Sequence, residues 1–178
     1  ITKIENILDA WKEFRNAKKN KIDVMEFEYS LMNNILNLHN DLGNKAYQHE
    51  SYHAFKINDP KPRDIHKSGV RDRVLHHAVY KVLYPLYDNI FIPDSYSCRI
   101  NKGTHKAINR FEKFTRKVSQ NHTKQCWVLK CDIRKFFSSI DQNILIKILE
   151  QKVEDRDILN LLQNIIQSFN SGITGKGL

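Results

Sequence analysis

The stretch CWVLKCDIRKFFSSID, residues 126–141, decides the fold assignment. Its first six residues are rich in strand-forming types and run directly into Asp132, so we expect a buried strand over 126–131 with that carboxylate at its end. Mg²⁺ takes carboxylate oxygens and keeps other positions for phosphates and water, so this placement suits metal-assisted phosphoryl transfer. Capping of the short helix that follows explains Asp132 equally well, whereas Asp141 precedes an amphipathic pattern and is expected to cap it.

The composition is that of a folded and basic protein. The chain has 178 residues, 40% of them hydrophobic, and a mean hydropathy of −0.57, which argues against disorder and against a membrane span. Its formal charge is +9, and residues 45–135 hold 19 Lys and Arg against 8 Asp and Glu. This clustering favours a polyanion partner over a generic solvated surface. The absence of a secretion signal predicts a cytoplasmic protein, and three cysteines without a CxxC pair predict buried reduced thiols.

The periodicity of apolar residues predicts mostly helix with few strands, and therefore an α+β fold. We expect helices over 4–18 and 23–43, and a third that Asp72 caps and that stops near Pro85. A further helix begins at Thr104 with its apolar residues facing inward, and two more lie over 144–149 and 158–169. Residues 52–65 predict a hairpin whose tip carries Pro60 and Pro62.

Two basic segments are candidates for binding phosphates. The first surrounds the hairpin, where Lys61, Arg63 and Arg73 have the chemistry to clamp a triphosphate, because guanidinium groups bind phosphate oxygens in pairs. The second runs from Asp94 into the Thr104 helix. Its candidates for holding a nucleic-acid backbone are Arg99, Lys102, Gly103, Lys106, Arg110 and Lys113. Ordinary exposed turns and ion pairs with nearby acids explain individual members of the first group, but not the whole group. The second segment matches no Walker or dinucleotide-binding fingerprint.

Taken together, four segments resemble the amino-terminal part of prokaryotic reverse transcriptases, of the diversity-generating retroelement and group II intron type. They are PKPRDI (60–65), RDRVLHHAVYKVLYPLYDNIF (71–91), IPDSYSCRINKGTHKAINR (92–110) and WVLKCDIRKFFSSID (127–141). The resemblance implies mostly helical fingers with a β-hairpin over 1–125 and the first part of a right-hand polymerase palm over 126–178.

The resemblance also implies roles for single residues. Asp132 and the carbonyl of Ile133 would bind Mg²⁺, or Mn²⁺ in its place, and Phe137 would exclude the 2′-hydroxyl of an incoming nucleotide. Arg63, with Lys61 and Arg73, would grip the triphosphate of a dNTP. Arg99, Lys102, Gly103 and the basic face of the following helix would lie along an RNA template and a DNA or RNA primer.

One departure from the family limits these implications. The second catalytic motif, a strand turn with Tyr, any residue, Asp and Asp, is not found in the sequence. Two-metal catalysis needs several converging carboxylates, so we expect this chain alone to be inactive as an RNA-directed DNA polymerase. The rival interpretation is a non-catalytic RNA-binding module derived from a reverse transcriptase.

Overall fold

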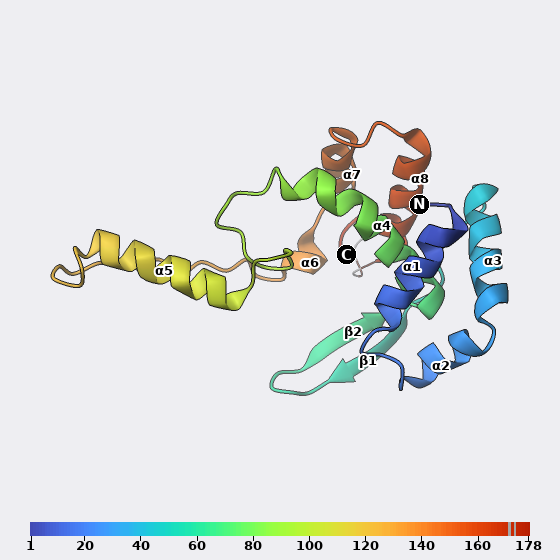
Figure 1. Cartoon of the computed structure of the whole chain (residues 1–178), viewed down its shortest axis with the longest axis horizontal. Coiled ribbons are helices and arrows are strands. Elements are labelled where there is room, and N and C mark those ends of the chain that lie inside the picture. Colours follow the sequence, from blue (N-terminus) through green and yellow to red (C-terminus); the bar gives the residue numbers. More distant parts are fainter. Residues whose placement is uncertain (171, 173) are drawn as a thin grey trace. The chain divides into compact units, whose positions relative to one another are not determined.

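The computed structural model describes residues 1–170, 172 and 174–178, and these form two compact units. Unit 1 comprises Ile1–Leu83 and Lys135–Leu178, and unit 2 comprises Tyr84–Arg134. Helices dominate both, and a two-stranded antiparallel sheet completes the expected α+β class (Figure 1). In the described part of the chain, no helix is both long enough and apolar enough to cross a bilayer. The expected boundary between fingers and palm at residue 125 stays a prediction.

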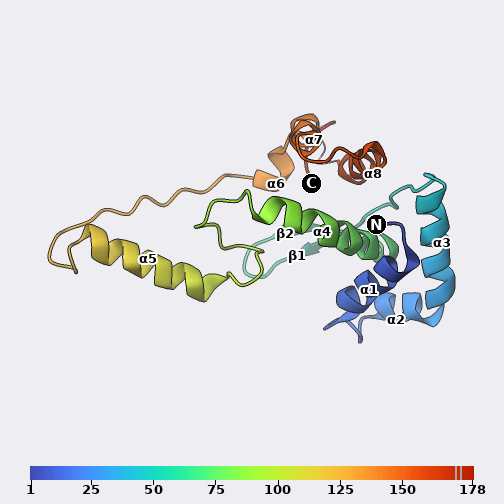
Figure 2. The ribbon, with the colours of Figure 1, turned by 45° about the horizontal axis from the view of Figure 1, so that its top comes forward.

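The core of unit 1 begins with three helices, α1 (Ile4–Arg15), α2 (Ile22–Tyr29) and α3 (Leu31–Gly43). α1 and α3 lie side by side in Figures 1 and 2 and bury an apolar face each. The fully buried side chains of this core include Ile7, Phe14, Val24, Ile35 and Leu38. The single helix expected over 23–43 is wrong, since Ser30 leaves the helical conformation with φ −116° and ψ 33°.

The hairpin consists of β1 (His53–Ile57) and β2 (Arg63–Lys67), paired in register from His53 opposite Lys67 to Ile57 opposite Arg63. It confirms the hairpin predicted from the proline-containing tip. α4 (Val70–Asp88) follows and passes through Pro85 instead of stopping there.

Asp72 does not cap α4, because it lies inside the helix with no exposed surface. Its carboxylate accepts hydrogen bonds from the Tyr47 hydroxyl (2.8 Å) and the Glu50 amide (3.1 Å). Burying a carboxylate is costly unless it is hydrogen-bonded, so these partners explain why it can lie in the core. Asp72 thereby ties the segment before the hairpin to α4.

The carboxyl-terminal part of unit 1 contains α6 (Phe136–Ser139), α7 (Gln142–Glu150) and α8 (Arg156–Gln167). Asp141 caps α7 by accepting from the Ile144 amide (3.1 Å), as predicted. The buried amide of Gln142 donates to the carbonyls of Ile166, Phe169 and Gly177. This one side chain therefore joins α7 to the end of α8 and to the last residues of the chain.

Unit 2 contains the end of α4, the loop after it and α5 (Thr104–Val118). α5 begins where predicted but has no buried residue, so its apolar side chains do not face inward as expected. The expected buried strand over 126–131 is also wrong. This segment is extended and exposed, and no strand of the described chain pairs with it. Cys98 and Cys131 are likewise exposed rather than buried, and Cys126 is half-buried.

Candidate nucleic-acid interface

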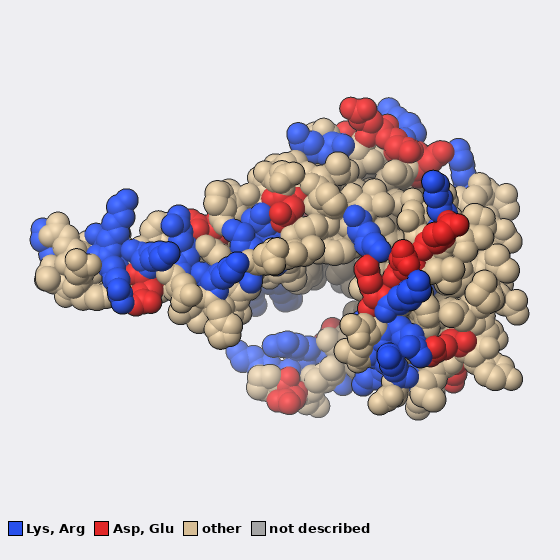
Figure 3. Space-filling view, in the orientation of Figure 1, with Lys and Arg blue, Asp and Glu red and all other residues tan. Residues whose placement is uncertain are grey.

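A basic groove of about 340 Å³ lies on unit 2, along one face of α5. Seven residues line it: Tyr96, Asn101, Lys102, Lys106, Asn109, Arg110 and Lys113. Four are cationic and none is acidic, so the groove carries a concentrated positive charge. Lys and Arg gather along the visible face of α5 in Figure 3. We call this feature the α5 groove.

Helical geometry explains the main wall of the α5 groove. Lys106, Arg110 and Lys113 are spaced by four and three residues, so they project from the same face of α5. Among the described residues, no acidic group lies within ion-pair distance of Lys106 or Lys113. Both ammonium groups are therefore available to an external anion.

The chain enters α5 through Gly103, whose φ of +108° is rarely adopted by residues with a side chain. Its carbonyl accepts from the Ala107 amide (3.1 Å) and its own amide donates to the Tyr96 carbonyl (3.2 Å). The glycine thus allows the sharp turn that places the preceding loop beside the start of the helix. Substitution at Gly103 would strain this turn although the space beside its Cα is open.

The loop side of the α5 groove is organised by short polar contacts. The Lys102 ammonium donates to the Pro93 carbonyl (2.6 Å) and lies 5.0 Å from the centre of the Tyr96 ring. The Arg110 guanidinium donates to both carboxylate oxygens of Asp94 (2.8 and 3.4 Å), and this holds the pKa of Asp94 below its usual value. Hydrogen bonds thus hold these two cations against the loop, whereas none within the described residues engages the ammonium groups of Lys106 and Lys113.

Arg99 lies inside the loop and not on the α5 groove. Its side chain is 9% exposed and pairs with Asp88 (Nε to Oδ1, 2.7 Å). The same guanidinium donates to the carbonyls of Asp88, Ile92 and Ser95. Of the residues predicted for nucleic-acid binding, the α5 groove therefore gathers Lys102, Lys106, Arg110 and Lys113. Gly103 lies at the start of α5, and Arg99 is enclosed within the loop.

The cations predicted to hold a triphosphate belong to unit 1 and do not form one cluster. Lys61 is exposed at the hairpin tip, and Arg63 is exposed at the start of β2. Arg73 is bound to Asp23 and lies over the Phe14 ring, with 5.0 Å between guanidinium carbon and ring centre. Burial opposes the lowering of the Asp23 pKa, but hydrogen bonds from Lys67 and Arg73 outweigh it. Arg73 is thus occupied by a carboxylate in unit 1.

Asp132 and Ile133 are exposed in the extended segment of unit 2, and Phe137 is exposed in α6 of unit 1. Within the described residues, no group of three or more His, Cys, Asp or Glu side chains is placed to hold a metal ion. Mg²⁺ is commonly bound through one or two carboxylates together with waters and substrate phosphates. The metal role of Asp132 and Ile133 therefore stays a prediction.

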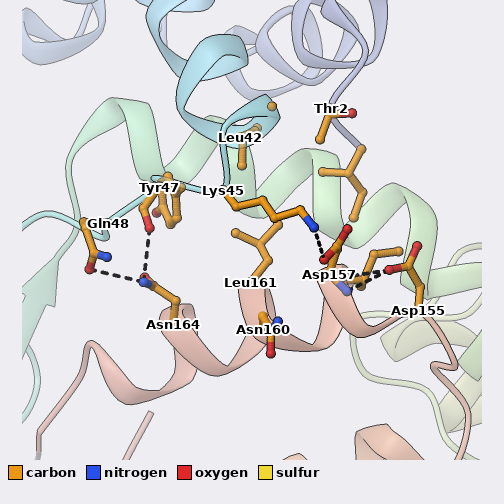
Figure 4. Close-up of a pocket in the computed structure, with 13 residues that line it drawn as sticks. Thr2, Leu42, Lys45, Tyr47, Gln48, Asp155, Asp157, Asn160, Leu161 and Asn164 are labelled. Carbon is orange, nitrogen blue, oxygen red and sulfur yellow. Dashed lines mark hydrogen bonds and ion pairs between the residues drawn. The ribbon is translucent and has the colours of Figure 1, made fainter.

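A second cavity, of about 530 Å³, lies in unit 1 between the end of α3 and the start of α8 (Figure 4). Several of its polar groups are already engaged in hydrogen bonds or ion pairs. Lys45 pairs with Asp157 (2.7 Å), Asp155 caps α8, and the Asn164 amide donates to the Tyr47 carbonyl (3.2 Å). Since few groups are left to bind a polar ligand, the α5 groove is the better candidate for function.

Sequence reasoning did not find Tyr96, Asn101 and Asn109 as groove residues. Asn109 was detectable, because it lies three residues after Lys106 on the same helical face. Tyr96 and Asn101 lie in the irregular segment before α5, where no periodicity indicates which side chains converge.

No family model matches the chain. Its curated relatives include Nuclear intron maturase 1, mitochondrial, of Arabidopsis thaliana, at 24% identity over 54% of the chain. Protein YkfC of Escherichia coli is 23% identical over 61% of the chain. A Saccharomyces cerevisiae protein named for intron 2 of COX1/OXI3 is 24% identical over 60%. The matches span only 13%, 28% and 12% of these relatives, so the chain is similar to a small part of proteins that include intron maturases.

Proposed function

We propose that this chain is an RNA-binding part of a protein related to reverse transcriptases and intron maturases, and that the α5 groove is its RNA-binding surface. The observation that carries the proposal is the convergence of four cations on one groove of unit 2. Arg110 pairs with Asp94, whereas Lys106 and Lys113 have no acidic partner among the described residues. The similarity to an intron maturase supports RNA as the polyanion.

The chemistry of the groove fits a nucleic-acid backbone. Lys106 and Lys113 lie seven residues apart on α5, a rise of about 10 Å, which spans more than one phosphate of a strand. Tyr96 offers an aromatic face, and Asn101 and Asn109 offer amides for hydrogen bonds to sugar or base edges. A backbone bound by Lys and Arg releases counterions, so affinity depends steeply on salt and little on sequence.

The test is RNA binding by the 178-residue chain and by the double variant Lys106→Glu/Lys113→Glu, measured by fluorescence anisotropy over a range of salt. Each lost phosphate contact lowers the log–log salt slope by about 0.7 on a single strand. We therefore expect a weaker affinity for all sequences alike and a slope reduced by about 1.4.

The matched control is Lys3→Glu/Lys19→Glu, which makes the same change of charge at exposed positions of unit 1. This variant should lose much less affinity than the groove variant. Equal losses in both variants would show that net charge alone governs binding, and an unchanged groove variant would remove the α5 groove from the function.

We further propose that this chain is a fragment of an RNA-directed DNA polymerase that extends a DNA or RNA primer with dNTPs. The resemblance supports Asp132 and Ile133 as contributors to its Mg²⁺ site and Phe137 as the residue under the incoming sugar. Lys61 and Arg63 are exposed, as triphosphate contacts must be. Phe137→Ala in such a polymerase should admit ribonucleotides, and unchanged sugar selection would remove that role. A cytoplasmic location belongs to the same proposal.

A further inference from the structure

The loop over residues 88–99 contributes Tyr96 to the lining of the α5 groove but none of its four cations. It supplies the Tyr96 ring to the groove lining, the Pro93 carbonyl to the Lys102 ammonium, and the Asp94 carboxylate to Arg110. The positions of two groove cations therefore depend on the conformation of this loop.

One side chain closes the loop on itself. The Arg99 guanidinium binds Asp88 at the loop start, through the carboxylate (2.7 Å) and the carbonyl (2.9 Å). It also donates to the carbonyls of Ile92 (3.0 Å) and Ser95 (3.4 Å) and lies over the Phe91 ring. The hydrogen bond from Arg99 holds the pKa of Asp88 below its usual value. The guanidinium thus makes four hydrogen bonds within the loop, and only a small part of the side chain reaches solvent.

We infer that Arg99 and Asp88 form a latch that positions the RNA-binding surface, and that Arg99 is a positioning residue rather than a phosphate contact. This inference rests on the proposed function of the α5 groove. Preorganised groups bind better because the ordering of side chains and loops does not have to occur on binding. Opening the latch should release Tyr96, Pro93 and Asp94 together, and with them Lys102 and Arg110.

The decisive variant is Asp88→Asn, because simple electrostatics and the latch predict opposite results. Removing an acid makes the protein more positive, so electrostatics alone predicts tighter RNA binding. The latch predicts weaker binding, by about tenfold, because the groove must then be ordered by the ligand. Arg99→Lys keeps the charge but loses the planar fork, so it should weaken binding as much as Asp88→Asn does. The double variant should lose no more than either single variant, since both open one latch.

The matched control is Glu112→Gln, which removes an acid of α5 that pairs with Arg116 and leaves the loop contacts intact. It should bind RNA as tightly as the unmodified chain or slightly more tightly. An independent readout is amide hydrogen exchange at Gly103, whose N–H donates to the Tyr96 carbonyl. Exchange there should accelerate in Asp88→Asn and Arg99→Lys without RNA present, and should not change in Glu112→Gln.

The outcomes separate this inference from the proposed function. If the unmodified chain binds RNA through Lys106 and Lys113 but Asp88→Asn binds equally or more tightly, the latch is refuted and the function stands. If RNA does not bind, the function fails, while the exchange rate at Gly103 still confirms or refutes the latch. Should Asp88→Asn fail to fold, Arg99→Lys carries the same test, and unchanged binding by it would refute the latch.

Discussion

A half-buried histidine in unit 1, His76, should make the stability of that unit fall as the pH falls from 7 to 5. His76 on α4 stacks on His49 with ring centres 5.4 Å apart, and its Nε2 atom is buried with no hydrogen-bond partner among the described residues. Burial, reinforced by the nearby His49, lowers the pKa of His76 to about 4 from an ordinary value of 6.5. The charged and titratable groups that act on it are His49, Asp72, His77 and Arg73.

The sign follows from proton binding. Between pH 6.5 and about 4 the unfolded chain binds a proton at His76 and the folded chain does not, so lowering the pH favours unfolding. The contribution of His76 is complete above pH 6.5 and is lost progressively below it. For these two pKa values, lowering the pH from 7 to 5 removes about 2 kcal/mol from the free energy of unfolding.

The assay is urea unfolding at pH 7 and pH 5, followed by the fluorescence of Trp11, which is 3% exposed in unit 1. Trp127 is already exposed in unit 2, and a Trp127→Phe background removes its signal. His76→Phe keeps a flat ring at the position but cannot take up a proton. The pH dependence should therefore be smaller in this variant by about 2 kcal/mol. Identical pH dependence with and without His76 would refute the reasoning.

Three further predictions concern packing, capping and catalysis. Phe14→Ala should destabilise unit 1 by about 3–5 kcal/mol, measured by urea unfolding, because it empties a fully buried site in the core. Asp155→Ala should lower the free energy of unfolding by about 1 kcal/mol in the same assay, because two amides of α8 lose their acceptor. The control is Asp9→Ala at an exposed position, and a smaller loss for Asp155→Ala than for this control would contradict the capping role. Purified chain should show no Mg²⁺-dependent primer extension, and measurable extension would overturn the expected inactivity.

Local patterns predicted the parts of the fold that depend on neighbouring residues. α1, the hairpin and the Asp141 cap follow from periodicity, turn residues and a single capping side chain. The break between α2 and α3 was not predictable in this way, since the apolar spacing continues through Ser30. There the Asn34 amide donates to the Phe27 carbonyl (2.9 Å) and replaces part of the helical hydrogen bonding.

Structural features that depend on contacts between residues distant in the sequence were not predicted correctly. The six residues CWVLKC have the composition of a strand, but a strand also needs a hydrogen-bonding neighbour, and the described chain provides none. Asp72 has the residue type of a helix cap, but its carboxylate is buried in the core. There it accepts a hydrogen bond from the hydroxyl of Tyr47, which lies 25 positions away in the sequence. For the site, helical spacing on α5 found the lysines, whereas the burial of Arg99 depends on Asp88 across the loop.

Unit 1 is assembled from two separated stretches of sequence, and the whole α5 groove lies in the stretch between them. None of the residues that line the groove belongs to the buried core. Substitutions that raise or lower the positive charge of α5 should therefore carry little penalty in folding, because no core contact is lost. The charge of this surface can change independently of the packing that stabilises unit 1.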